Sequence, residues 1–83
     1  PNPFAGSTVI RFSVPATGRA AVKVFDVRGA LVATLVDRVL PPGPHELLWD
    51  GRTGTGGRAA AGVYFLQLRQ GDARRAVKFV RSR

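Results

Sequence analysis

Four of the ten glycines lie within seven residues of each other, in the stretch WDGRTGTGGR at positions 49–58. Loops of this composition can cradle phosphate groups, and the dinucleotide pattern G-x-G-x-x-G/A is met at Gly54, Gly56 and Ala59. A site of that kind needs a strand before the glycines and a helix after them, because the helix N-terminus holds the pyrophosphate. The residues after the loop therefore decide whether nucleotide chemistry is present.

These residues argue against a nucleotide site. Residues 58–61 leave room for one helical turn at most before Gly62 begins a run of β-branched and aromatic residues. A Walker-type phosphate loop requires Lys and then Ser or Thr after its glycines, and Gly57 and Arg58 stand at these positions. We therefore predict that residues 50–62 form a wide connection between two strands.

Residue types for catalysis are sparse. His45 is the only histidine, it directly follows Pro44, and the serines lie at positions 7, 13 and 82, so no Ser-His pair is indicated. The carboxylates fall in or beside separate predicted turns, where aspartate is favoured for local hydrogen bonds; they are Asp26, Asp37, Glu46, Asp50 and Asp72. With no cysteine, thiolate metal sites and disulfides are excluded. We expect no enzymatic activity and no cofactor.

The charge is strongly positive, with thirteen basic against five acidic residues and a formal net charge of +8. Such a field favours anionic partners. The cations are spread from Arg11 to Arg83, which is typical of a solvated surface, so we expect no specific nucleic-acid binding. An anionic surface polysaccharide remains an alternative partner if Trp49 and Tyr64 form an exposed stacking platform. A single tryptophan in a small domain is more often part of the core.

The elements that must position these residues are short strands, because turn signals recur every eight to twelve residues and valine-rich, alternating segments lie between them. The predicted strands cover residues 7–14, 20–27, 31–36, 45–50, 62–69 and 73–81. The segment 62–69 is apolar on both faces at its start, so we expect it at the centre of a sheet. Three prolines within residues 41–44 predict a loop. The fold class is therefore all-β, with antiparallel strands.

The length of 83 residues corresponds to one domain, and no apolar run approaches the length needed to span a membrane. The sequence opens at Pro1 and contains no methionine. We expect residues 1–83 to be a single domain and a piece, C-terminal in position, of a larger protein.

Five short motifs together resemble a known family. They are Asn2-Pro3-Phe4, Val24-Phe25-Asp26-x-x-Gly29, Pro42-Gly43-x-His45, Trp49-Asp50-Gly51 and Gly62-Val63-Tyr64-Phe65. In this order they resemble the Ig-like domain of flagellar hook-capping proteins and the related C-terminal sorting domains of type IX secretion cargo.

This resemblance implies a small Ig-like antiparallel β-sandwich of about six to seven strands without catalytic residues. It implies export through the periplasm to the cell surface or medium, with the secretion machinery at the outer membrane or neighbouring surface-protein subunits as partners. The domain would serve secretion, sorting or surface anchoring; the alternative is a structural assembly module of a surface fibre or hook-cap-like complex. Fold-determining turn positions would be Asp26, Gly29, Asp50, Gly51 and Gly62.

The recognition surface implied by the resemblance is the last strand with its tail. Its residues would be Arg74, Arg75, Lys78, Phe79, Val80, Arg81 and Arg83. An edge strand presents unpaired amide and carbonyl groups that a partner strand can extend. Basic residues on an edge strand also discourage aggregation, so both interpretations of these cations stay open.

Overall fold

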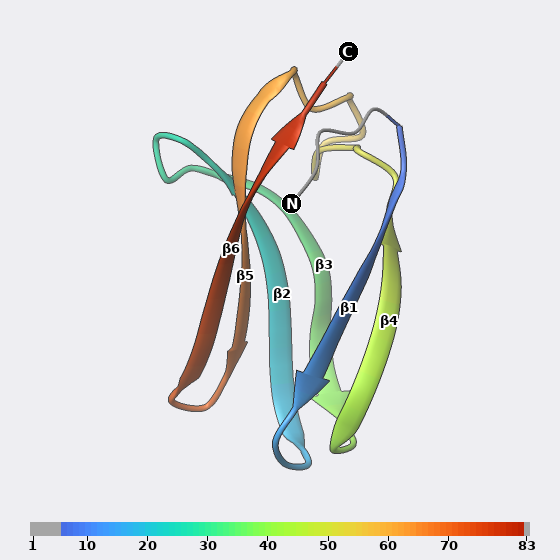
Figure 1. The fold of residues 1–83 in the computed structure, drawn as a ribbon, viewed down its shortest axis with the longest axis vertical. Coiled ribbons are helices and arrows are strands. Elements are labelled where there is room, and N and C mark those ends of the chain that lie inside the picture. The colour runs from blue at the N-terminus through green and yellow to red at the C-terminus, as the bar shows by residue number, and fades with distance from the viewer. Residues whose placement is uncertain (1–5, 83) are drawn as a thin grey trace.

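The computed structural model describes residues 6–82, which form six β-strands and no helix (Figure 1). The strands are β1 (Thr8–Val14), β2 (Gly18–Asp26), β3 (Leu31–Leu40), β4 (Gly43–Trp49), β5 (Gly62–Gln70) and β6 (Ala73–Arg81). The prediction of an all-β, Ig-like fold is confirmed.

Two antiparallel sheets pack face to face. The smaller sheet contains β1 and β4, and the larger has the strand order β3-β2-β5-β6. The predicted central position of residues 62–69 is confirmed, since β5 lies between β2 and β6. Figure 1 shows the β5–β6 turn and β4 on opposite sides of the molecule. The two-stranded sheet therefore covers only part of the four-stranded one.

The core lies between the sheets and follows the alternation in the sequence. Val22 and Val24 of β2 are fully buried, whereas their neighbour Lys23 belongs to the outer face. Trp49 packs edge-on against the rings of Tyr64 and Phe79, with centroid separations of 6.2 and 5.8 Å. Aromatic pairs prefer this geometry because the positive ring edge meets the negative ring face.

The strand boundaries differ from the prediction by at most two residues, except at the end of β3, which lies four residues further on. β3 continues past the expected end at Val36 to Leu40, and β4 begins at Gly43, so that Pro44 pairs with Ser13 inside a strand. Among residues 6–82 the smaller sheet has two strands, so both are edge strands. An edge strand tolerates a proline whose missing N–H would face away from the partner. The predicted loop over residues 41–44 is thus shorter than expected.

The first hairpin turn joins β2 to β3 through Asp26 and Gly29. Asp26 accepts hydrogen bonds on Oδ1 from the backbone N–H groups of Arg28 (2.9 Å) and Ala30 (3.0 Å). Gly29 has a φ of 84°, a region that glycine adopts at little steric cost. These bonds hold the pKa of Asp26 below its usual value, with the bond from Ala30 as the largest cause.

Candidate functional site

The glycine-rich loop uses its amide groups internally. Thr53 donates to the carbonyl of Gly57 at 2.7 Å, and Ala59 donates to that of Gly51 at 2.8 Å. Gly54 donates to Val32 of β3 at 2.9 Å, which fastens the loop to the larger sheet. The prediction of a wide inter-strand connection is confirmed, because residues 50–62 contain no helix.

The one histidine has a structural setting. The His45 ring stacks on Phe12 with 5.5 Å between centroids, and its Nε2 lies 2.7 Å from the carbonyl oxygen of Pro41. Within residues 6–82, no group of three or more His, Asp or Glu side chains is placed to hold a metal ion. The described side chains therefore offer no assembled chemistry around His45.

The alternative prediction of a sugar-stacking platform is wrong, because the rings of Trp49 and Tyr64 both belong to the core. Trp49 is 2 % exposed and donates its indole N–H to the carbonyl of Arg52 at 3.0 Å. Tyr64 is also buried, and its hydroxyl donates to the carbonyl of Ala60 at 2.6 Å. Neither ring face is available to a polysaccharide.

The last strand, β6, carries most of the predicted recognition residues, but the structure divides them between two faces. Alternate residues of a strand point to opposite sides of a sheet. Arg74, Lys78 and Val80 share the outer face, opposite Arg69, Phe65 and Val63 of β5. Residues on the inner side are Arg75, Val77, Phe79 and Arg81. Arg83 lies outside the described residues.

Arg81 is buried rather than exposed at the sheet edge, which corrects the expectation that it adds to the surface charge. Its side chain is 4 % exposed, and its Nε donates to the carbonyl of Ala59 at 3.0 Å. Its Nη1 donates to the carbonyl of Gly6 at 2.9 Å, and its Cζ lies 5.7 Å from the centre of the Trp49 ring. Arg81 thus ties the end of β6 to the glycine loop and to the start of the described chain.

Gly51 makes room for this arginine. Its φ is 80°, and a Cβ built at this position would collide with the Arg81 guanidinium. The sequence marks Gly51 as a turn glycine, but it gives no sign of the arginine thirty positions away in the chain that lies against it. Asp50 supports the same bend by accepting the backbone N–H of Arg52 at 3.0 Å.

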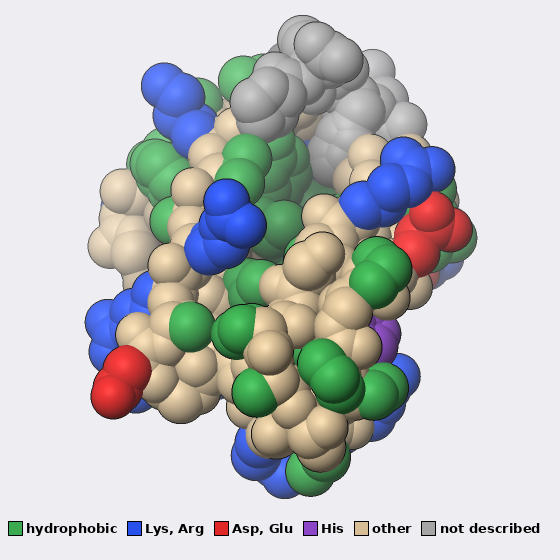
Figure 2. All heavy atoms as spheres, turned by 60° about the horizontal axis from the view of Figure 1, so that its bottom comes forward, with side chains coloured by type: hydrophobic (Ala, Val, Ile, Leu, Met, Phe, Trp, Pro, Cys, Tyr) green, Lys and Arg blue, Asp and Glu red, His purple; other side chains and the backbone are tan. Residues whose placement is uncertain are grey.

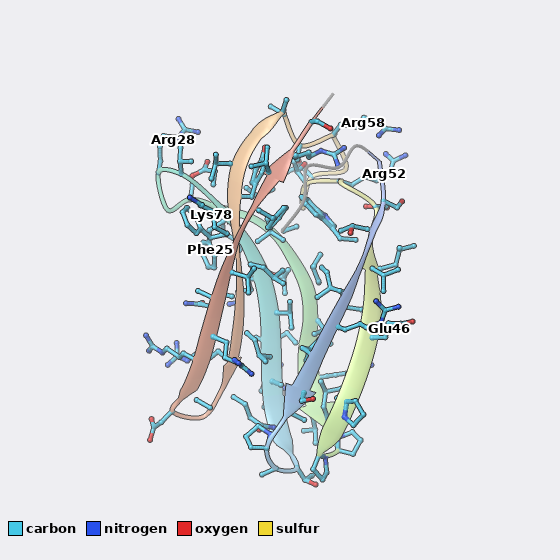
Figure 3. The ribbon with its side chains drawn as sticks, in the orientation of Figure 1. Phe25, Arg28, Glu46, Arg52, Arg58 and Lys78 are labelled. Carbon is cyan, nitrogen blue, oxygen red and sulfur yellow. The ribbon has the colours of Figure 1, made fainter. Side chains whose placement is uncertain are left out.

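The outer face of the larger sheet holds cations without carboxylate partners in the described part of the chain. Lys23, Arg69, Arg74 and Lys78 form no ion pair there. Arg69 lies directly opposite Arg74, and Phe65 lies directly opposite both Lys78 and, on its other side, Phe25. Figure 3 places Phe25 and Lys78 in the same region of the structure. Like charges directly opposite each other destabilise a sheet. The pair Arg69 and Arg74 therefore lowers the stability of the sheet unless an anion screens it.

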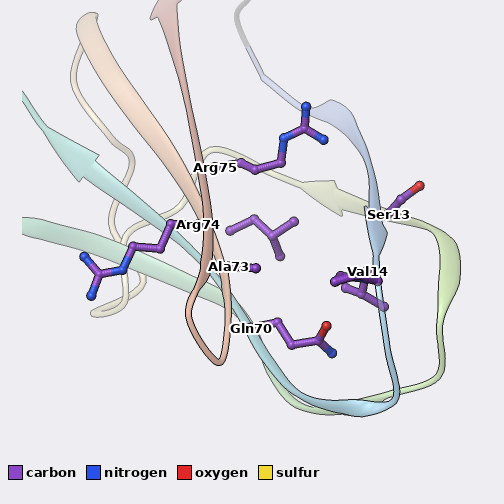
Figure 4. Close-up of a pocket in the computed structure, with 8 residues that line it drawn as sticks. Ser13, Val14, Gln70, Ala73, Arg74 and Arg75 are labelled. Carbon is purple, nitrogen blue, oxygen red and sulfur yellow. The ribbon is translucent and has the colours of Figure 1, made fainter.

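Between β1 and the β5–β6 hairpin lies a groove of about 350 Å³. It is lined by Ser13, Val14, Pro15, Leu68, Gln70, Ala73, Arg74 and Arg75. Figure 4 shows that Arg74 and Arg75 point to opposite sides of β6. Figure 2, with the lower end of the molecule turned forward, shows hydrophobic side chains on this face and most of the visible basic ones toward its margins. A second hollow of about 480 Å³ shares Ser13 and Arg75 with the first and continues along β1.

Comparison with known proteins decides the family. The model of the FlgD Ig-like domain matches residues 4–73. The chain belongs to this family. Domains of the FlgD Ig-like family are non-catalytic structural modules. The match ends at Ala73, the first residue of β6, so the remaining residues of this strand lie beyond the family match.

Solved structures share the fold of this FlgD Ig-like domain. FlgD from Xanthomonas campestris, described as giving insights into the hook capping essential for flagellar assembly, is 26 % identical, with a TM-score of 0.69 over 90 % of this chain. FlgD from P. aeruginosa is 17 % identical over 89 % of this chain, also with a TM-score of 0.69. PorZ of Porphyromonas gingivalis, a bacterial surface component of the type IX secretion system, is 22 % identical over 90 % of it, with a TM-score of 0.61.

This Ig-like domain corresponds to only part of each of those proteins. It spans 57 % of either FlgD chain and 11 % of the PorZ chain. A search of curated proteins found no match. No helix among residues 6–82 is long and apolar enough to cross a membrane.

Proposed function

We propose that this FlgD Ig-like domain is a non-catalytic secretion, sorting or surface-anchoring module of a larger extracytoplasmic bacterial protein, and that β6 with its tail is the strand its partner recognises. The observation that carries the proposal is the open edge of β6. Within the described residues β6 pairs with β5 alone, over nine residues, and contains three exposed cations and no carboxylate.

The proposed recognition residues contribute to the recognition strand in different ways. Phe79 and Arg81 anchor the inner side of β6, because Phe79 stacks on Tyr64 with 5.9 Å between centroids and Arg81 bonds to the glycine loop. Arg74, Arg75 and Lys78 leave their charges accessible. Val80 adds an exposed apolar position on the outer face, and Arg83 extends the basic character beyond the described residues.

The similarity to a type IX component is one of fold alone, and it supports a surface-associated role rather than a specific one. The test is export of a reporter in a bacterium that has a type IX secretion system. A secreted reporter with residues 1–83 at its C-terminus is expected on the cell surface or in the medium. Equal periplasmic retention with and without residues 1–83 would contradict the proposal.

A second candidate is a structural assembly module within a surface fibre or cap. The 26 % identity to a FlgD that is described in terms of hook capping favours it. Exposed apolar residues on edge strands, such as Val39 of β3 and Leu48 of β4, offer contacts to neighbouring subunits. Light scattering coupled to size-exclusion chromatography distinguishes the two roles, since an assembly module should form oligomers as concentration rises and a strict monomer would exclude it.

A further inference from the structure

We propose that β6 accepts an acidic, extended segment of a partner protein as an additional antiparallel strand, and that this strand lies over the groove between β6 and β1. The inference rests on the proposed function in one respect, namely that β6 is the recognised strand. It adds the chemistry of the partner and the register in which the two strands meet.

The β5–β6 turn fixes which backbone groups of β6 are open. Gln70 pairs with Ala73 across a two-residue loop whose first residue, Gly71, has a φ of 56°, as in a type II′ turn. The residues that flank such a loop exchange both backbone hydrogen bonds, and the bonding alternates from there. Residues 74, 76, 78 and 80 therefore direct their N–H and C=O groups away from β5, toward an incoming strand.

The inner side of β6 is left uncovered next to that open edge. Val77 is on the inner side and is 47 % exposed, and Ala73 and Arg75 are exposed as well. The groove beside them is lined by Val14 and Leu68 from the two facing sheets. A strand added to β6 would place every second side chain over this groove and remove apolar surface from water.

The outer face sets the charge of the incoming strand. Arg74 and Lys78 lie four positions apart on one face of β6, so two residues four apart on an added strand would lie directly opposite them. Carboxylates at these two positions would be paired with cations that have no ion pair in the described structure. They would also offset the repulsion between Arg74 and Arg69.

The same charges disfavour a second copy of this domain as the occupant. Antiparallel pairing of β6 with another β6 would set strands that each carry three exposed cations and no carboxylate against each other. Like charges placed directly opposite each other are unfavourable across strands. An acidic segment of a different protein is the occupant that fits both the open backbone and the charge.

The probe is a nine-residue synthetic peptide with glutamate at the two positions opposite Arg74 and Lys78 and valine at the positions over the groove. Titrated into ¹⁵N-labelled domain, it is expected to shift the amide resonances of residues 74, 76, 78 and 80 and to slow their hydrogen exchange. The same peptide with both glutamates replaced by lysine is expected to bind at least about tenfold more weakly.

A charge reversal makes the test specific. The double variant Arg74→Glu with Lys78→Glu should prefer the lysine peptide. The double variant Arg38→Glu with Arg58→Glu, which changes the net charge equally at exposed positions off β6, should keep the glutamate preference. Equal binding of both peptides, an unchanged preference in the first variant, or no resonance shift at about 1 mM peptide overturns the inference.

This experiment separates the inference from the function on which it rests. If the reporter reaches the surface but the glutamate peptide does not bind β6, only the acidic-strand inference is wrong. If the peptide binds as expected but the reporter stays in the periplasm, the export role is wrong and the binding site stands.

Discussion

At the scale of single residues, Gly51 lies directly against the Arg81 guanidinium, more tightly packed than any other described glycine. Gly51→Ala should lower the free energy of unfolding by at least about 2 kcal/mol, because an alanine must adopt a left-handed backbone and also displace the guanidinium. Gly57→Ala is the matched control in the same loop, since its added Cβ would meet nothing nearer than 3.8 Å. Urea unfolding curves of the two variants should differ clearly; equal midpoints would contradict this account of Gly51.

Arg81→Lys keeps the charge but should still destabilise the domain, by about 2 kcal/mol. A lysine ammonium cannot reproduce the fork with which Arg81 bonds the carbonyls of Ala59 and Gly6. A buried carbonyl that loses its donor retains its desolvation cost. Thermal unfolding measures the effect, and Arg58→Lys at an exposed position of the loop should leave the midpoint unchanged. An Arg81→Lys midpoint equal to that of the control would show that the fork is dispensable.

The Asp26 turn makes stability depend on pH. The lowered pKa of Asp26 means that the folded state favours the carboxylate, through the N–H groups of Ala30 and Arg28. This contribution is complete above the usual pKa of about 3.8 and is lost as the pH falls through the lower value of the folded state. Asp26→Asn should therefore flatten the acid limb of the stability curve. The measurement is the free energy of unfolding of the unchanged domain and of Asp26→Asn between about pH 2 and pH 6. Parallel curves for the two proteins would refute the role of Asp26.

At the scale of elements, turn signals and alternation in the sequence were sufficient to place all six strands. The prediction failed at Pro44, because the sequence does not show that β4 pairs with β1 alone in the described part of the chain and so tolerates a proline. The family resemblance, for its part, grouped the basic residues of β6 as one recognition edge. Their division follows from the alternation of side chains along β6, and burial of Phe79 and Arg81 against the core shows which face is the inner one.

The cross-strand pair of Arg69 and Arg74 can be tested within the elements themselves. Arg74→Glu would place opposite charges directly across β5 and β6 and should stabilise the domain by about 0.5 kcal/mol. Arg58→Glu makes the same change of charge at an exposed position of the loop and should change the free energy of unfolding less. Chemical denaturation of the two variants measures the difference, and a less stable Arg74→Glu domain would show that the two guanidinium groups do not repel each other.

At the scale of the whole molecule, a two-stranded sheet packs on a four-stranded one and leaves the far strand, β6, open along its edge and on part of its inner side. The family relationship was recognisable from five motifs in the sequence, and the FlgD Ig-like match confirms it. The groove was not predictable, since it arises from the unequal widths of the two sheets. The buried position of Arg81 was equally hidden, because arginine side chains are ordinarily exposed.

The central claim is that a partner in export or anchoring recognises the open, basic edge of β6. The most direct measurement is the fraction of a secreted reporter that reaches the cell surface when it is fused to each of three domains: the unchanged chain, the Arg74→Glu/Lys78→Glu variant and the Arg38→Glu/Arg58→Glu variant. The account predicts that the first and third deliver the reporter and that the second leaves it in the periplasm. Equal delivery by all three folded domains would contradict it.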